Sequence, residues 1–284
     1  MDNTAHAAAP TTATAPASPR VAVVTGASRG LGLELARALA ADGWQLVITA
    51  RGENELLAVE RELAGRTKVV ALAGSVVDDD HRERLAEAAA ALGGAELLVN
   101  NASTLTGYPL EGAPLPKLAE FPLPGLLETF EVNVLGPIAL TQLLLPQLRS
   151  HRGSVLNLSS DAAVEAYAGW GGYGASKAAL DHASAVLAEE EPELRVWAVD
   201  PGDMRTVMHQ EAFPGEDISD RPLPVTVVPA FLALLAGRPD SGRYRAGDFH
   251  PADPHVGADP HDGAGAVQGE DAPLTGSAPT TGEH

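Results

Sequence analysis

The chain has 284 residues and carries 38 acidic against 19 basic side chains, for a formal net charge of -19, and it contains no cysteine. Without cysteine there are no disulfides, no thiolate metal ligands and no cysteine nucleophile. The negative charge repels nucleic acid and anionic lipid, so neither is an expected partner. Hydrophobic residues make up 45% of the chain, enough to bury a core, which excludes a wholly disordered protein.

Both ends of the chain lack the large apolar residues that a folded core needs. Residues 1–19 are mostly Ala, Thr and Pro, and residues 249–284 are mostly Gly, Asp, Pro, His and Thr. Such segments bury too little apolar surface to offset the entropy lost on folding. We therefore expect a disordered tail at each end of one domain that covers residues 20–248.

Neither a targeting signal nor a metal motif is visible in the sequence. The chain has no basic start followed by an apolar stretch and no window of about 18 apolar residues, so we expect a cytoplasmic protein without a membrane span. The C-terminal tail contains His250, His255 and His261, but proline and glycine interrupt their spacing. No metal site is predicted there.

Between the tails, short continuous apolar runs alternate with longer stretches of helical periodicity. The first two runs are VAVVT at 21–25 and QLVITA at 45–50, with an amphipathic helix between them. Further runs of this kind lie at 68–74, 96–100, 153–159 and 194–200, and a seventh strand is expected near 243–247. Strands separated by helices require crossover connections. The pattern therefore predicts an α/β fold, a Rossmann-type doubly wound parallel sheet of about seven strands with helices on both faces.

The first predicted strand runs into a glycine-rich turn, TGASRGLG, that opens a helix. Glycines permit a tight turn and let backbone N–H groups approach a pyrophosphate at the positive end of the helix. Three residues separate the first two glycines, whereas the common G-x-G-x-x-G motif has one. We predict a dinucleotide site formed by Gly26, Ser28, Arg29, Gly30, Leu31 and Gly32.

Tyr173 and Lys177 are four residues apart at the start of a predicted helix, so they share one face. An adjacent ammonium lowers the pKa of a phenol and so suits it to exchange a proton with a carbonyl, although such a pair is more often an ordinary surface pair. Ser160 follows the apolar run at 153–159, where its hydroxyl can bond a substrate oxygen, and Ser159 is the competing choice.

Asn133 lies in a helix predicted over 125–150, and taken alone it is either a functional residue or a buried amide bonded to the backbone. In order and spacing, Asn133, Ser160, Tyr173 and Lys177 resemble the catalytic tetrad of the short-chain dehydrogenase/reductase family, in its compact single-domain branch. The glycine turn, Asn100-Asn101-Ala102 and Pro201-Gly202 also match.

The resemblance implies hydride transfer between nicotinamide C4 and a carbonyl or alcohol carbon. Tyr173 would exchange the proton and Ser160 would polarise the oxygen. Lys177 would hold the ribose hydroxyls and lower the pKa of the tyrosine, and Asn133 would help to hold a water in the proton relay. The resemblance also implies cofactor contacts from Ser75, Val76, Asn101, Ala102, Ser103, Tyr173, Lys177, Pro201, Gly202, Met204 and Thr206.

The cofactor is predicted to be NADP(H), with NAD(H) as the second choice. No carboxylate follows the second strand, where NAD enzymes usually bind the ribose hydroxyls, and Arg29 and Arg51 are available to bind a 2′-phosphate. The alternative is that both arginines lie on the rim of the site. The chain departs from the family at Ser75, where an Asp commonly contacts adenine, and at Ser103, which replaces a glycine.

The predicted substrate wall is mixed, with apolar and aromatic groups predominating, and comprises Thr104, Leu105, Ala162, Tyr167, Trp170 and Asp203. No pair of cationic side chains lies there to bind an anionic substrate, so we expect the substrate to be a small neutral ketone, aldehyde or secondary alcohol. The segment at 203–224 is either a lid or an ordinary surface loop. By resemblance, the helices at 126–150 and 172–190 are expected to form a homodimer or homotetramer.

Two other functions remain open at this point. One is a dinucleotide-binding sensor or scaffold without turnover, against which the complete tetrad argues. The other is an isomerase or dehydratase that uses the cofactor transiently, but such relatives usually carry an additional substrate domain.

Overall fold

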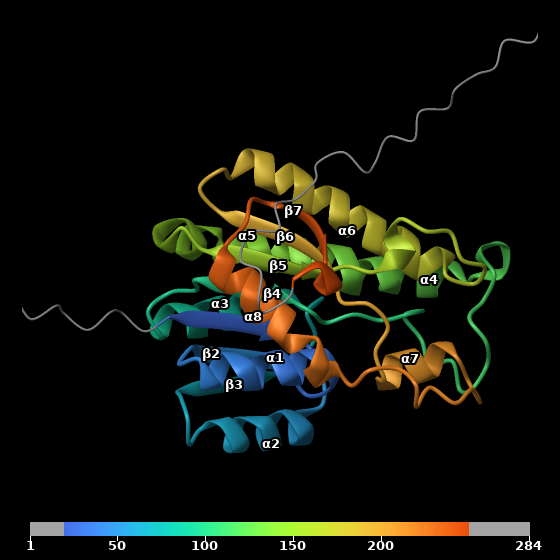
Figure 1. Cartoon of the computed structure of the whole chain (residues 1–284), viewed down its shortest axis with the longest axis horizontal. Coiled ribbons are helices and arrows are strands. Elements are labelled where there is room, and N and C mark those ends of the chain that lie inside the picture. The colour runs from blue at the N-terminus through green and yellow to red at the C-terminus, as the bar shows by residue number, and fades with distance from the viewer. Residues whose placement is uncertain (1–19, 250–284) are drawn as a thin grey trace, which may run out of the picture.

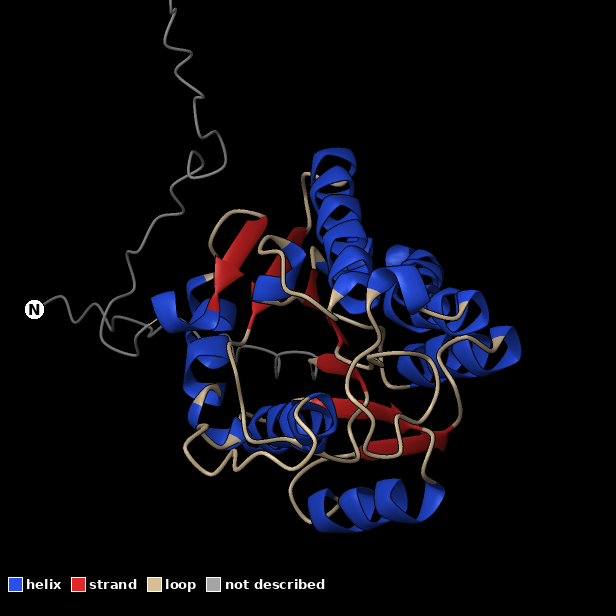
Figure 2. Ribbon diagram, turned by 90° about the vertical axis from the view of Figure 1, so that its right-hand side faces the viewer, coloured by secondary structure: helices blue, strands red, loops and turns tan. Residues whose placement is uncertain are grey.

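Seven strands form one parallel sheet in the order β3-β2-β1-β4-β5-β6-β7, and helices cover both faces of it (Figure 1 and Figure 2). This computed structural model describes residues 20–249. The strands are β1 (Val21–Thr25), β2 (Gln45–Ala50), β3 (Val69–Ala73), β4 (Leu97–Asn100), β5 (Ser154–Leu158), β6 (Arg195–Asp200) and β7 (Gly242–Arg245). The predicted α/β class, Rossmann-type sheet and single domain are confirmed.

Eight α-helices connect or follow the strands in the described part of the chain. They are α1 (Gly30–Ala41), α2 (Glu53–Leu63), α3 (Asp79–Ala91), α4 (Leu123–Phe130), α5 (Gly136–His151), α6 (Gly171–Glu190), α7 (Val207–Ala212) and α8 (Val228–Gly237). Helix α8 was not predicted, because its sequence VPAFLALLAG has no polar face that would mark it as amphipathic. No described helix is both long and apolar enough to cross a membrane.

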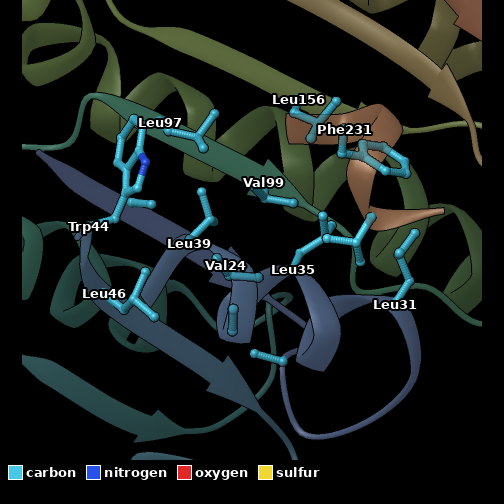
Figure 3. Packing of buried hydrophobic residues seen from close by; sticks show 14 of the residues in the cluster. Val24, Leu31, Leu35, Leu39, Trp44, Leu46, Leu97, Val99, Leu156 and Phe231 are labelled. Atoms are coloured by element: carbon cyan, nitrogen blue, oxygen red, sulfur yellow. The ribbon is translucent and has the colours of Figure 1, made fainter. Parts of the chain in front are cut away.

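The core is divided by the sheet into two layers, because successive side chains of a strand point to opposite faces. In β1, Ala22 and Val24 pack with α1, α2 and α8, whereas Val21 and Val23 pack with α3, α5 and α6. Figure 3 shows the first layer, in which side chains of α1 and Phe231 of α8 lie over the strands. Continuous apolar strands therefore reflect burial on both faces.

The long helix predicted over 125–150 is interrupted in the structure. A five-residue π-helical segment, Glu131–Leu135, separates α4 from α5. Such a wide turn is common at functional sites, and here it contains Asn133. Gly136 follows it, and a Cβ at this position would lie 3.0 Å from the Val76 carbonyl oxygen. The close approach of α5 to the loop after β3 therefore leaves little room for a larger side chain at this position.

The strand order reverses at β1, which pairs with β2 on one side and with β4 on the other. A crevice forms at the carboxyl ends of the strands on either side of such a point, and ligands of open α/β sheets bind there. The glycine turn after β1, the loop after β4 and the serines after β5 all lie at this edge. The fold thus gathers the predicted motifs at one place.

The C-terminal boundary of the domain differs by one residue from the prediction. Phe249 was assigned to the tail, but its ring packs edge-on against Tyr244, with the ring centroids 5.2 Å apart. It also contacts the apolar cluster under α1 and α8. The predicted tails at 1–19 and from residue 250 onward, with His250, His255 and His261, lie outside the described residues.

Candidate active site

The glycine turn after β1 is held in place by Asn101. The Nδ2 atom of Asn101 donates to the carbonyl oxygens of Thr25 at 2.9 Å and Gly26 at 3.1 Å. The Thr25 hydroxyl in turn accepts from the backbone N–H groups of Asn101 and Ala102, both at 3.0 Å. The Asn101 side chain is therefore committed to the turn, and only its backbone is free to lie along a cofactor.

The first glycine of the turn is required by both conformation and space. Gly26 has φ +66°, and a Cβ there would lie 2.7 Å from the Asn101 amide nitrogen. Gly30 also has a positive φ, +58°, and the Thr206 methyl group lies 3.8 Å from where its Cβ would be. The beginning of the segment 203–224 therefore lies against the glycine turn.

The start of α1 fits an anionic group. Its N-cap residue, Arg29, makes no side-chain capping bond, so no side chain of that residue accepts from the first N–H groups of the helix. The side chain of Leu31 is buried in the core, as is that of Val76. If these two residues contact a cofactor, they do so through their backbone.

A hollow of about 750 Å³ opens at the carboxyl ends of the strands. Arg29 and Arg51 line one part of it, and Thr104 and the loop 107–112 line another, while α7 contributes Val207. The sequence reasoning placed Thr104 here but missed the loop 107–112. Its signal was the Gly- and Pro-containing stretch directly after the Asn-Asn-Ala motif.

Tyr173 lies half-buried near the start of α6. Burial raises the pKa of Tyr173 above that of a free phenol, and the hydroxyls of Ser160 and Ser103 act in the opposite direction. The expected lowering of this pKa by Lys177 is therefore not what the structure shows, because desolvation is the largest influence. Asp200 is a second cause that raises it. The phenol consequently holds its proton at neutral pH.

Lys177 is almost fully buried, with 2% of its surface exposed. Its ammonium donates to the Leu158 carbonyl oxygen at 2.7 Å and lies 5.5 Å from the centroid of the Tyr173 ring. Burial lowers the pKa of Lys177 to about 8, and the carboxylate of Asp181 acts in the opposite direction. The lysine therefore remains mostly protonated at pH 7.

The two serines after β5 point to different partners. The Ser160 hydroxyl donates to Asp161 at 3.0 Å and acts on the Tyr173 phenol. The Ser159 hydroxyl is buried and donates to Asp181 at 2.7 Å. Of the two, Ser160 is therefore the serine beside the tyrosine. Asp161 accepts these local bonds, including one from the Tyr167 hydroxyl at 3.1 Å.

Asn133 uses all the hydrogen-bonding capacity of its amide inside the protein. Its Nδ2 atom donates to the Thr104 carbonyl oxygen and to the Ser176 hydroxyl, both at 2.9 Å. Its Oδ1 atom accepts from the Thr104 N–H at 2.8 Å and the Ser103 hydroxyl at 3.1 Å. A primary amide offers two donors and two acceptor positions. The side chain thus fixes the loop after β4 to α6 and has no bond left for the predicted water.

The predicted substrate wall is brought together only in part. Trp170 packs edge-on against Tyr173, with ring centroids 5.7 Å apart, and its ring centroid lies 5.9 Å from that of Phe213. Phe213 was missed because it lies in the polar, Pro-containing segment after α7. Asp203 is directed elsewhere, since its carboxylate lies 3.6 Å from the guanidinium of Arg221. Leu105 and Ala162 are buried. Within residues 20–249, no group of three or more His, Asp or Glu is placed to hold a metal ion.

Comparison with known proteins gives a consistent result. The family model described as short chain dehydrogenase matches residues 20–217. L-fucose dehydrogenase of Oryctolagus cuniculus is 34% identical over 194 residues, which are 68% of this chain and 65% of that enzyme. The uncharacterized oxidoreductase YciK of Escherichia coli is 32% identical over 245 residues, which are 83% of this chain and 92% of that protein. A putative short chain dehydrogenase of Shigella flexneri, solved in complex with NADP, superimposes with a TM-score of 0.74 and 28% identity over 80% of this chain and 97% of that one. The chain therefore belongs to the short-chain dehydrogenase family of oxidoreductases.

Proposed function

We propose that this chain is an NADP(H)-dependent oxidoreductase that interconverts a carbonyl and a secondary alcohol on a small, mostly neutral substrate. The observation that carries the proposal is the grouping of three side chains: the Ser160 hydroxyl lies beside the Tyr173 phenol, and the buried ammonium of Lys177 lies 5.5 Å from the centroid of the Tyr173 ring. A polarising hydroxyl and a proton donor on one oxygen are what carbonyl reduction requires.

The bound nicotinamide would supply or accept the hydride. Tyr173 would hold the proton at its phenol oxygen and pass it to the substrate oxygen as charge develops there. Ser160 would orient that oxygen by a hydrogen bond. Lys177 would hold the ribose hydroxyls through its ammonium, and Asn133 would keep the loop that contains Ser103 and Thr104 in register with α6.

Two arginines support NADP(H) as the preferred cofactor. Arg29 and Arg51 are exposed and line the same hollow, directly after β1 and β2. Guanidinium groups bind phosphate by charge-assisted hydrogen bonds. No carboxylate follows β2 at the position where it would bind a ribose 2′-hydroxyl. NADP in the Shigella flexneri structure is consistent with this preference.

The cofactor preference and the reaction can be tested in one absorbance assay. NADPH and NADH oxidation would be followed with a panel of ketones, aldehydes, diketones and quinones. We expect turnover with NADPH on at least one of them. Arg51→Ala should raise the KM for NADPH by about tenfold, the equivalent of one lost charge-assisted bond, and leave the KM for NADH unchanged.

Arg66→Ala, an exposed arginine in the turn after α2, serves as the matched control and should change neither KM. An equal effect of Arg51→Ala on both cofactors would contradict the assignment of a 2′-phosphate site. NADPH binding without turnover on any compound would favour the sensor function instead.

A homodimer or homotetramer is proposed as the assembly. Large apolar side chains are exposed along α4, the π-helical segment and α5, among them Leu123 (76% exposed), Leu127 (60%) and Leu135 (55%). Exposed apolar side chains that follow one pair of helices are typical of protein interfaces. The family resemblance predicted self-association through the helices at 126–150 and 172–190, and α4 and α5 cover the first of these ranges.

A further inference from the structure

A group of charged side chains lies behind the catalytic residues, and the reaction described above does not use it. Its members are Asp181 on α6, Arg243 on β7 and Asp200 at the end of β6. The Nε atom of Arg243 donates to Asp181 Oδ2 at 2.9 Å, and another nitrogen of its guanidinium lies 3.9 Å from Asp200 Oδ2. The side chain of Asp181 is 12% exposed and that of Asp200 is 7% exposed. Charges this deeply buried need such partners to stay ionised.

Asp181 lies on the face of α6 that carries the catalytic pair. Tyr173, Lys177 and Asp181 follow each other at intervals of four residues, so each lies about one turn beyond the previous one. One carboxylate oxygen of Asp181, Oδ2, accepts from Ser159 at 2.7 Å and from Arg243. The other, Oδ1, is buried and has no hydrogen-bond donor among residues 20–249. Hydrogen bonds thus fix the carboxylate at one oxygen, about one helical turn beyond Lys177.

The same guanidinium also holds the main chain of the active site. The Nη2 atom of Arg243, the nitrogen that lies near Asp200, donates to the carbonyl oxygen of Ser160 at 2.9 Å. One side chain therefore links the carboxylate on α6 to the residue whose hydroxyl lies beside Tyr173. A guanidinium suits this task because its donors lie in one rigid plane.

Several elements that pack on α6 carry charged residues. These elements carry Asp161 after β5, Asp200 on β6, Arg243 on β7, Glu131 in the π-helical segment, Glu128 on α4, and Asp181 on α6 itself, and of these charges Asp181 is the one that acts on the pKa of Lys177. Asp161 and Asp200 act on the pKa of Tyr173, whereas Asp181 is the charge that raises the pKa of Lys177 against the effect of burial. Among these groups, Asp181 is therefore the one whose charge favours the protonated form of the lysine.

We propose that Asp181 is a positioning residue that, held by Ser159 and Arg243, keeps the buried ammonium of Lys177 protonated at neutral pH and ties α6 to the main chain at Ser160. The inference rests on the proposed function, in which Lys177 needs its positive charge to hold the ribose hydroxyls. Without the carboxylate, desolvation alone would act on the lysine, and its proton would be lost at lower pH.

The proton on Lys177 can be followed directly, because the chain contains only three lysines and the other two, Lys68 and Lys117, are exposed. Isotope labelling of lysine side chains gives three NMR signals, and Lys177→Arg assigns the one of interest. In Asp181→Asn we expect the titration midpoint of Lys177 to fall by about one pH unit, as for a lysine that loses a close opposite charge. The midpoints of Lys68 and Lys117 should not move. An unchanged midpoint of Lys177 would overturn the inference.

A second variant guards against failure to fold. Asp181→Asn leaves the Arg243 guanidinium with one fewer buried partner, so the double variant Asp181→Asn/Arg243→Gln removes both charges and keeps hydrogen-bonding groups at both positions. Removing the Arg243 cation raises the pKa of Lys177, so the double variant is compared with Arg243→Gln alone, from which it differs only in the carboxylate. The Lys177 midpoint is expected to be lower in the double variant, and equal midpoints in these two variants would overturn the inference. Glu62→Gln is the matched control, since Glu62 pairs with Arg37 at 2.7 Å on the far surface of α1 and α2.

The pH profile of turnover links the charge of Lys177 to the reaction. In Asp181→Asn, the loss of NADPH oxidation at alkaline pH should begin about one pH unit lower than in the parent protein. The NMR titration needs neither cofactor nor substrate. Its failure therefore contradicts the role of Asp181 alone, whereas absence of turnover in the parent protein contradicts the proposed function alone.

Discussion

At the scale of single residues, the site is built from polar groups whose burial sets their proton affinity. Desolvation raises the pKa of the Tyr173 phenol and lowers that of the Lys177 ammonium to about 8. Burial thus favours the neutral form of each group. The tyrosine stays protonated at neutral pH. The lysine also stays charged at neutral pH, and the burial of its charged form lowers the stability of the folded protein.

The free-energy cost of burying the Lys177 ammonium predicts a pH-dependent effect of Lys177→Met on stability. The pKa of the lysine is about 8 in the folded protein and 10.5 in the unfolded chain, so the unfolded chain binds more protons between these values. The loss of stability caused by the buried ammonium is complete below pH 8 and disappears as the pH rises to 10.5. After allowance for the lost bond to Leu158, we expect the variant to be about 2 kcal/mol more stable than the parent at pH 7.

Urea unfolding of both proteins at pH 7 and pH 10 measures this difference. The gain in the free energy of unfolding should be largest at pH 7 and vanish or reverse at pH 10. A difference that is the same at both pH values would show that the buried charge is not its cause.

At the scale of elements, the strands and their helical connections follow from the sequence because strands buried on both faces are continuously apolar. The break between α4 and α5 does not, since one π-helical turn in Glu131–Leu135 leaves the helical periodicity nearly unchanged. Yet this turn directs Asn133 at the loop after β4. The sequence indicated the residue and left open which function its amide has, because its four bonds come from residues 29 to 43 positions away.

The packing of this element predicts the effect of Asn133→Ala. The change leaves the backbone N–H and carbonyl of Thr104 and the hydroxyl of Ser176 without their partner in a buried place. We expect the free energy of unfolding to fall by about 2 to 4 kcal/mol, because each unsatisfied buried group costs about 1 to 3 kcal/mol and some will find other partners.

Chemical denaturation measures this loss, and Asn54→Ala, at an exposed position of α2, is the matched control with an expected effect within about 0.5 kcal/mol. If Asn133→Ala were as mild as the control, the loop after β4 would not depend on this amide.

The group behind the active site was also beyond the sequence. Asp181 and Arg243 are 62 positions apart and meet only because β7 lies beside β6, under α6. Local spacing reveals pairs on one helix, such as Tyr173 and Lys177, but not pairs that the sheet order creates. The candidate catalytic residues were therefore visible as a pattern in the sequence, whereas the group of Asp181, Arg243 and Asp200 became visible only in the fold.

At the scale of the whole molecule, the candidate functional residues lie at one edge of the sheet. Two neighbouring helices, α4 and α5, expose apolar side chains to solvent. Leu127 is 60% exposed on α4. If α4 and α5 form the proposed interface, Leu127→Glu places a charge in it, and a buried unpaired charge strongly opposes association. We expect the variant to be a folded monomer.

Light scattering coupled to size-exclusion chromatography measures the mass of both proteins. Val225→Glu is the matched control, because Val225 is 50% exposed near α8 and away from these helices, and it should leave the parent assembly intact. A parent protein that is monomeric, or a Leu127→Glu variant with the parent mass, would contradict the interface.

The central claim is that Tyr173 donates the proton, and Tyr173→Phe tests it most directly. The change removes one hydroxyl and keeps the ring that packs against Trp170. NADPH binding, followed by the fluorescence of the cofactor, and NADPH oxidation with the best substrate of the panel would be measured on the same samples. We expect the affinity to change less than about twofold and turnover to fall by about 10³-fold, the usual contribution of a positioned acid. Turnover at the parent rate with unchanged binding would contradict the account.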